Sequence, residues 1–150
     1  MKVTRINHGQ EEENEIEIRI EAGWKADKRI VFSGAGNVMS NGQTQDVVFV
    51  IKEMNHKVFR RQGDDLFVTQ TISLKDALSG YLFYCVGVDG EEIYYEINDV
   101  ISPGDTRRIV GKGMSKEGGE RGDIIIKFDV AFPAQLSQEL KIYIAEHFPV

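Results

Sequence analysis

An internal repeat with an offset of 77 residues is the strongest constraint on the fold of this chain. Two glycines and one aspartate recur at that offset (Gly34 to Gly111, Gly36 to Gly113, Asp46 to Asp123). The apolar positions around them match as well: Ile16, Ile18 and Ile20 with Ile93, Tyr95 and Ile97, and residues 47–49 with 124–126. A solenoid would need three or more units to bury a continuous core, so a repeat of two predicts two small modules of one topology.

Within each unit the apolar residues have the period of β-strands. Residues 15–20 alternate strictly between charged side chains and isoleucine, which is typical of a strand with one buried and one wet face. Further runs rich in Val, Ile, Phe and Tyr predict strands at residues 29–32, 47–52, 66–68, 81–86, 93–97 and 124–130. The dipeptide Asp89-Gly90 predicts a tight hairpin between residues 81–86 and 93–97.

Two helical segments are predicted among the strands. Ser73 can cap a short helix that ends at Gly80. A second helix is predicted from near Ser137 to about His147, with apolar residues at spacings of three and four. We therefore expect a mainly β fold of two tandem β-sandwich-like modules with similar topology, short helices and a C-terminal amphipathic helix. The expected divisions are residues 1–69, 70–134 and 135–150.

Charge and composition argue against several classes of protein. The formal net charge of -6 argues against a general nucleic-acid binder, which needs an excess of Lys and Arg on some face. The chain lacks the apolar run of a secretory signal or a membrane span, so we expect a soluble, cytoplasmic protein without a membrane partner. A single cysteine, Cys85, excludes an internal disulfide framework and a cysteine-rich zinc module.

The residues that could carry chemistry have ordinary structural interpretations. The glycine pairs at residues 34–36 and 111–113 lack the dinucleotide fingerprint and a following helix, so they are expected to serve β connections. Adjacent carboxylates at Asp64 and Asp65 would point to opposite faces of an extended segment. Cys85 lies in an apolar run, which predicts a buried thiol. We expect no enzymatic activity, cofactor or metal.

Several short motifs, each weak alone, occur together in an order typical of one family. They are Gly23-Trp24-Lys25, residues 46–50, His56-Lys57-Val58-Phe59-Arg60-Arg61, Gly63-Asp64-Asp65-Leu66, residues 73–80 and Arg121-Gly122-Asp123. Over nearly the whole chain they resemble the C-terminal region of DnaJ-type heat-shock co-chaperones, and the lack of Cys-x-x-Cys units is similar to class B (type II). The chain has no His-Pro-Asp motif of a J domain. The resemblance implies a client-binding fragment unable by itself to stimulate the ATPase of the seventy-kilodalton heat-shock chaperone.

The resemblance also implies roles for individual residues. Met1, Val3 and Phe59 are expected on the walls of a hydrophobic client groove, and Lys2 with Arg5 nearest the positions that bind the acidic Glu-Glu-Val-Asp tail of the heat-shock chaperone. The chain is acidic near residue 13, so we expect altered tail recognition. We also expect the chain to begin inside the first module. The expected dimer interface comprises Leu136, Leu140, Tyr143, Ile144 and Phe148.

The predicted function is therefore passive binding of unfolded or non-native polypeptide, in cooperation with the seventy-kilodalton heat-shock chaperone and as a homodimer. An alternative from another class is a structural or assembly adaptor that recognises one specific folded partner through its β modules. Unrelated apolar peptides would displace the ligand of a chaperone and leave the partner of an adaptor bound.

Overall fold

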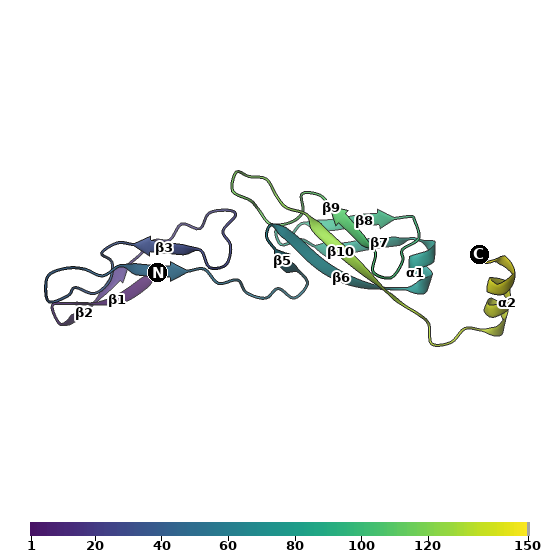
Figure 1. The fold of residues 1–150 in the computed structure, drawn as a ribbon, viewed down its shortest axis with the longest axis horizontal. Helices are drawn as coiled ribbons and strands as arrows, with labels where there is room; N and C mark the ends of the chain where they lie inside the picture. The colour runs from purple at the N-terminus through teal and green to yellow at the C-terminus, as the bar shows by residue number, and fades with distance from the viewer. Residues whose placement is uncertain (150) are drawn as a thin grey trace.

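A computed structural model describes residues 1–149 and is mainly β, with four small sheets and two helices in that range (Figure 1). The molecule is elongated. Strands β1–β4 form one group, strands β5–β10 with α1 form a second, and α2 lies beyond the second group (Figure 1). We call the first group the N-terminal unit and the second the central unit.

The N-terminal unit consists of two antiparallel pairs. Strand β1 (Lys2–Asn7) pairs with β2 (Gln10–Glu15), and β3 (Arg29–Phe32) pairs with β4 (Val47–Val50). The β1–β2 turn places His8 and Gly9 at φ angles of 49° and 83°. Two positive φ angles in succession are what a two-residue hairpin turn requires, since they match the twist of its strands.

The central unit combines a four-stranded sheet with a two-stranded ribbon. The sheet has the order β5-β6-β10-β9, and β6 and β10 run parallel. Strands β7 and β8 form the ribbon, which confirms the predicted hairpin, with Gly90 at a φ of 84°. The bounds are β5 Arg60–Gln62, β6 Asp65–Ser73, β7 Tyr81–Val86, β8 Glu92–Ile97, β9 Thr106–Ile109 and β10 Ile124–Ala131.

The hydrophobic core lies in the central unit. Among residues 1–149, Ile16 is the one buried large apolar side chain outside a single cluster. That cluster includes Ile124, Ile126 and Phe128 on one face of β10, each with no exposed surface. Burying a side chain of this size contributes roughly 1.5–3 kcal/mol. The cluster also contains Phe59, Leu66, Val68, Ile72, Ala77, Phe83, Cys85, Ile93, Ile97 and Ile101.

The repeat is visible in the hydrogen bonds of both units. The Gly34 amide donates to Asp46 Oδ1 at 2.9 Å, and the Gly111 amide donates to Asp123 Oδ1 at the same distance. The two glycines have φ angles of 68° and 72°, which favour glycine. Strands β9 and β10 occupy the repeat positions of β3 and β4 and pair in the same antiparallel manner. The predicted similarity of the two units is confirmed.

The strand predicted at residues 15–20 is wrong beyond its first residue. Strand β2 ends at Glu15, and Ile16 exchanges backbone hydrogen bonds of 2.7 Å with Met1. Beyond this point no described strand lies opposite residues 17–20, and Ile20 is 80% exposed. Alternation alone therefore does not make a strand, because the backbone also needs a partner. Strands β2, β5 and β9 were not predicted, since their polar sequences lack the apolar pattern.

Both predicted helices are present. In α1 (Leu74–Ser79) the N-cap Ser73 accepts a hydrogen bond from the Asp76 amide, and Gly80 ends the helix. In α2 (Gln138–His147) the N-cap Ser137 accepts from the Leu140 amide. The predicted division at residues 69 and 70 falls inside β6, and the division at 134 and 135 falls between β10 and α2. The three-part division stays a prediction.

A small polar contact, which we call the joint, connects the two units. Gly23 has a φ of 88°, and a Cβ there would lie 2.6 Å from the backbone nitrogen of Glu117 in the loop before β10. Arg61 of β5 donates to the Trp24 carbonyl at 3.2 Å. Lys25 forms an ion pair of 3.2 Å with Asp64. Backbone approach at this point therefore requires glycine at residue 23.

Candidate functional site

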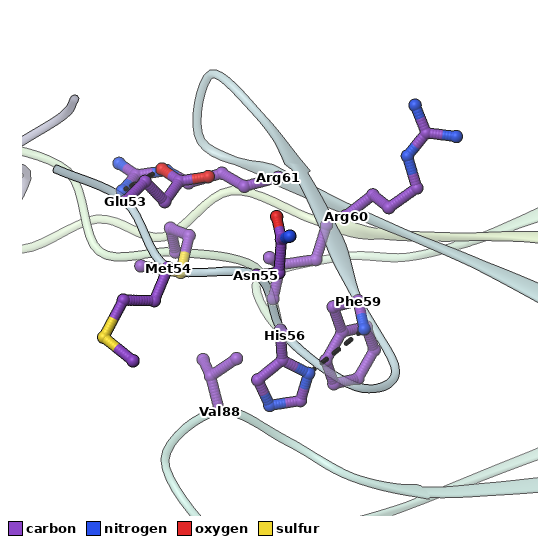
Figure 2. A pocket seen from close by; sticks show the side chains of 10 residues that line it. Glu53, Met54, Asn55, His56, Phe59, Arg60, Arg61 and Val88 are labelled. Carbon is purple, nitrogen blue, oxygen red and sulfur yellow. Dashed lines mark hydrogen bonds and ion pairs between the residues drawn. The ribbon is translucent and has the colours of Figure 1, made fainter.

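A pocket of about 640 Å³ beside Phe59 is the candidate site (Figure 2). It lies where the segment between β4 and β5 meets the β7–β8 turn and the loop before β10. Its lining residues are Glu53, Met54, Asn55, His56, Phe59, Arg60, Arg61, Leu66, Val88 and Met114. A pocket of this volume lies in the range of small-ligand and side-chain sites.

The accessible apolar surface of this pocket comes from residues other than Phe59. Phe59 is 3% exposed and belongs to the core cluster, whereas Met54 is 88% and Val88 is 41% exposed. Met54 and Val88 were missed in the sequence, because neither lies in a periodic run. A methionine in a segment between strands was the available signal, since its flexible thioether suits adaptable binding surfaces.

His56 fixes the backbone that carries Phe59. Its Nδ1 accepts hydrogen bonds from the amides of Val58 and Phe59, both at 3.1 Å. The imidazole also lies beside the Phe59 ring, with 5.4 Å between ring centroids and an angle of 32° between the ring planes (Figure 2). Because Nδ1 is an acceptor, the neutral ring carries its proton on Nε2. The histidine thus has a structural role at this pocket.

Arg61 forms the polar side of the pocket and also reaches the joint. Its side chain is 12% exposed, and it donates to the Gly63 carbonyl at 2.8 Å and to Glu53 Oε2 at 3.4 Å. Because these contacts hold the guanidinium in place, Arg61 has a structural role at the pocket and the joint. In Figure 2 the neighbouring Arg60 side chain extends away from Phe59.

The structure does not bring the three expected client-binding residues together. Met1 is 68% exposed, and Val3 is half-buried on β1. Both lie in the N-terminal unit, which contains β1 (Figure 1). Phe59 packs in the core of the central unit and lines a pocket without them. Phe59 belongs to the core cluster with residues of β6 and β10. Client binding by Met1, Val3 and Phe59 stays a prediction.

Both cations expected to bind an acidic tail already face carboxylates. Lys2 Nζ lies 2.9 Å from Glu13 Oε2, and Arg5 forms an ion pair with Glu12 across the β1–β2 hairpin. The Lys2–Glu13 pair is exposed, and exposed pairs contribute roughly 0.2–1 kcal/mol, so a stronger ligand can displace it. The Arg5–Glu12 pair is partly buried. An acidic tail would nevertheless compete with Glu12 and Glu13, and tail binding stays a prediction.

The residues expected at the dimer interface do converge on one surface. A second pocket, of about 950 Å³, lies between α1, the end of β10 and α2. Its lining includes all five expected residues: Leu136, Leu140, Tyr143, Ile144 and Phe148. Tyr143 is 61% and Phe148 is 53% exposed, so this surface is open to solvent. Dimerisation through it stays a prediction.

Other chemistry has little support in the part of the chain that the structure covers. Burial raises the pKa of the Cys85 thiol, which disfavours the nucleophilic thiolate. Residues 1–149 contain no group of three or more His, Cys, Asp or Glu side chains placed to hold a metal ion. Neither described helix is long and apolar enough to cross a membrane.

Comparison with known proteins places these features in a family. A family model described as the DnaJ C terminal domain matches residues 1–133. The chain is 38% identical to DnaJ protein homolog 1 of Drosophila melanogaster, across 99% of this chain and 47% of that protein. It is 34% identical to DnaJ homolog subfamily B member 5 of Homo sapiens (99% and 45%) and 33% identical to Protein SIS1 of Saccharomyces cerevisiae (94% and 41%).

The chain thus spans less than half of the length of each of these relatives. The motifs that carried the resemblance lie within the matched residues, from Gly23-Trp24-Lys25 to Arg121-Gly122-Asp123. The family match covers most of the chain and includes both units of the fold. The chain belongs to the DnaJ C-terminal domain family.

Proposed function

We propose that this chain binds non-native polypeptide and cooperates with a seventy-kilodalton heat-shock chaperone in protein folding. The observation that carries the proposal is the family match over residues 1–133. An open pocket with exposed Met54 and Val88 supports it, because flexible apolar side chains can adapt to varied ligands. Absence of catalysis and a cytoplasmic location are parts of the same proposal.

The mechanism is passive holding without a cofactor. An apolar side chain of an extended client enters the pocket between Met54, Val88 and the edge of the core at Phe59. Burying one client Leu or Phe contributes roughly 1.5–3 kcal/mol, which by itself gives weak binding. Weak single sites also allow the client to be released to the next chaperone.

Dimerisation would raise the effective affinity. Two copies that associate through α2 would present two pockets to one client, and linked sites gain from raised effective concentration. Replacing Tyr143 and Ile144 by Asp is expected to produce a monomer by light scattering and to reduce suppression of client aggregation. Unchanged suppression by a proven monomer would exclude this arrangement.

Fluorescence anisotropy of a labelled, extended apolar peptide tests client binding. Phe59→Asp is unsuitable, because a charge at a 3% exposed position would unfold the core. Met54→Asp changes an 88% exposed side chain of the pocket, and Met39→Asp is a matched control at a 47% exposed methionine of the N-terminal unit. We expect saturable binding that Met54→Asp weakens and Met39→Asp retains. A folded wild-type chain that binds no such peptide would contradict the proposal.

A further inference from the structure

The outer face of the β7–β8 ribbon is apolar although the structure leaves it uncovered. Strand β7 has apolar or aromatic side chains at all its positions, and its inner residues Phe83 and Cys85 are buried. On the outer face Leu82, Tyr84 and Val86 are 56%, 47% and 48% exposed. A continuous apolar run is typical of a strand covered on both faces, so this sequence suits a covered outer face.

The β1–β2 ribbon of the N-terminal unit shows that a two-stranded ribbon in this protein can have a polar outer face. On the β1–β2 ribbon the outward side chains are Lys2, Thr4, Ile6, Glu11, Glu13 and Glu15. Ile6 is the one apolar member, and the others are polar or charged, as expected for a face in water. The apolar outer face of β7–β8 is therefore a feature of that surface and is not required for a ribbon of this kind to form.

Acidic and aromatic groups give this face a defined chemistry. Tyr94 is 60% exposed and packs beside Tyr84, with ring centroids 5.0 Å apart. Glu92 and Glu96 lie directly across the ribbon from Val86 and Leu82. Within residues 1–149 no Lys or Arg lies within ion-pair distance of either carboxylate.

Other acidic side chains near the same hairpin already have basic partners. Asp89 pairs with Arg121, and Glu91 pairs with Lys112. Glu92 accepts a hydrogen bond of 3.1 Å from the Tyr84 hydroxyl. Glu92 and Glu96 are therefore carboxylates without a basic partner among residues 1–149, and they flank the exposed tyrosine and aliphatic side chains. A ligand that supplies both apolar and positively charged groups would complement this arrangement.

We propose that the outer face of β7–β8 is a docking surface for client segments that combine aliphatic or aromatic side chains with Lys or Arg. The inference rests on the proposed function, and it names the class of segment and a second place of contact besides the Phe59 pocket. Apolar side chains of the client cover Leu82, Tyr84 and Tyr94. Its cations face Glu92 and Glu96, and a cation over the exposed tyrosine ring adds to the attraction.

Anisotropy with two short labelled peptides tests the apolar part of the inference. One peptide alternates Leu with Lys, and the other alternates Leu with Glu. The triple variant Leu82→Thr, Tyr84→Thr, Tyr94→Thr keeps β propensity while removing the apolar face. We expect it to weaken binding of the Leu/Lys peptide about tenfold or more. Ile6→Thr on the outer face of the first ribbon is the matched control and is expected to bind normally.

A second variant tests the charges with little risk to folding. The double variant Glu92→Gln, Glu96→Gln keeps side-chain size. We expect it to weaken binding of the Leu/Lys peptide about threefold at low salt. The Leu/Glu peptide is expected to bind the wild-type chain more weakly than the Leu/Lys peptide and to gain affinity in this variant. Equal affinity of the wild-type chain for the two peptides would overturn the charge preference.

The outcomes separate this inference from the proposed function. If Met54→Asp abolishes binding and the folded triple variant binds like wild type, the ribbon is no docking surface and the proposed function stands. If wild type binds neither peptide nor the extended apolar peptide, both fail. If the triple variant changes the molar mass by light scattering and leaves peptide affinity unchanged, the face joins copies of this chain and the inference is overturned.

Discussion

The two units of this protein share the same turn chemistry and differ in how much they bury. Each has a glycine amide that donates to an aspartate carboxylate at 2.9 Å before the corresponding strand. The central unit adds a continuous core, whereas the N-terminal unit contributes Ile16 as its one buried large apolar side chain among residues 1–149. Turn residues can therefore specify a topology, while stability depends on how many strands cover one another.

Sheet pairing explains this difference. In the central unit β10 lies between β6 and β9, so its apolar face meets neighbours on both sides. In the N-terminal unit β4 pairs with β3 alone. A two-stranded sheet is marginally stable in water, so the N-terminal unit depends on its connecting loops and on the joint.

The largest expected effect compares one phenylalanine from each unit. Phe83 has no exposed surface, whereas Phe49 is half-buried and packs edge-on against Phe32 at 5.7 Å. We expect Phe83→Ala to lower the free energy of unfolding by about 3–5 kcal/mol and Phe49→Ala by about 1–2 kcal/mol. Urea unfolding measures both. Equal losses would refute the assignment of stability to the central unit.

The joint offers the next comparison. Gly23 and Gly42 have φ angles of 88° and 81°, but only a Cβ at Gly23 meets another segment, 2.6 Å from Glu117. Alanine at either position is expected to lower the free energy of unfolding by about 1–2 kcal/mol, because a positive φ is unfavourable for a residue with a Cβ. We expect Gly23→Ala to cost more and to shift the emission of Trp24, the sole tryptophan. A Trp24 spectrum that is the same in both variants would show that the joint tolerates the methyl group.

Both repeated aspartates accept a hydrogen bond from a glycine amide, and Asp123 also forms an ion pair of 2.6 Å with Arg108. This ion pair predicts that the stability contributed by Asp123 depends on pH. The Gly111 amide, followed by Arg108, lowers the pKa of Asp123 below 3.8. A lowered folded-state pKa stabilises the protein above the unfolded value and loses this contribution as pH falls through the folded value. We expect Asp123→Asn to destabilise at neutral pH more than Asp46→Asn, with the gap closing below about pH 4. Thermal midpoints across pH measure this, and a constant gap would contradict it.

The smallest expected effect concerns the helix caps. Ser73 and Ser137 cap α1 and α2 in the same way. Replacing such a cap by Ala costs about 0.5–2 kcal/mol of helix stability. Because α1 buries Ala77 in the core and α2 has no buried residue, Ser73→Ala should lower global stability. Ser137→Ala should only increase amide exchange in α2, and a global loss in that variant would show that α2 packs more firmly.

Much of the fold followed from local patterns. The glycine and aspartate repeat, the Asp89-Gly90 hairpin and the Ser73 cap each act over a few residues, so they were predicted and confirmed. Residues 15–20 were predicted wrongly because their alternation is local but strand pairing is not. The polar strands escaped prediction for the same reason, since their partners lie elsewhere in the chain.

The candidate site was less predictable than the fold. Phe59 was singled out as a large ring in a basic segment, but its burial among the residues of β6 and β10 depends on contacts distant in sequence. The pocket surface comes from Met54 and Val88, which lie more than thirty residues apart in the chain and meet only in space. The pairing of Lys2 with Glu13 likewise depends on the register of a hairpin.

The amino-acid order by itself determined the β class, the two similar units, the capped helices and the family, because turn propensity and periodicity are local properties. The tertiary structure decided where the core lies, that Phe59 belongs to it, and which ribbon face stays both apolar and open. Burial depends on which strands come to lie against one another, and that arrangement follows from the long-range pairing of β6 with β10.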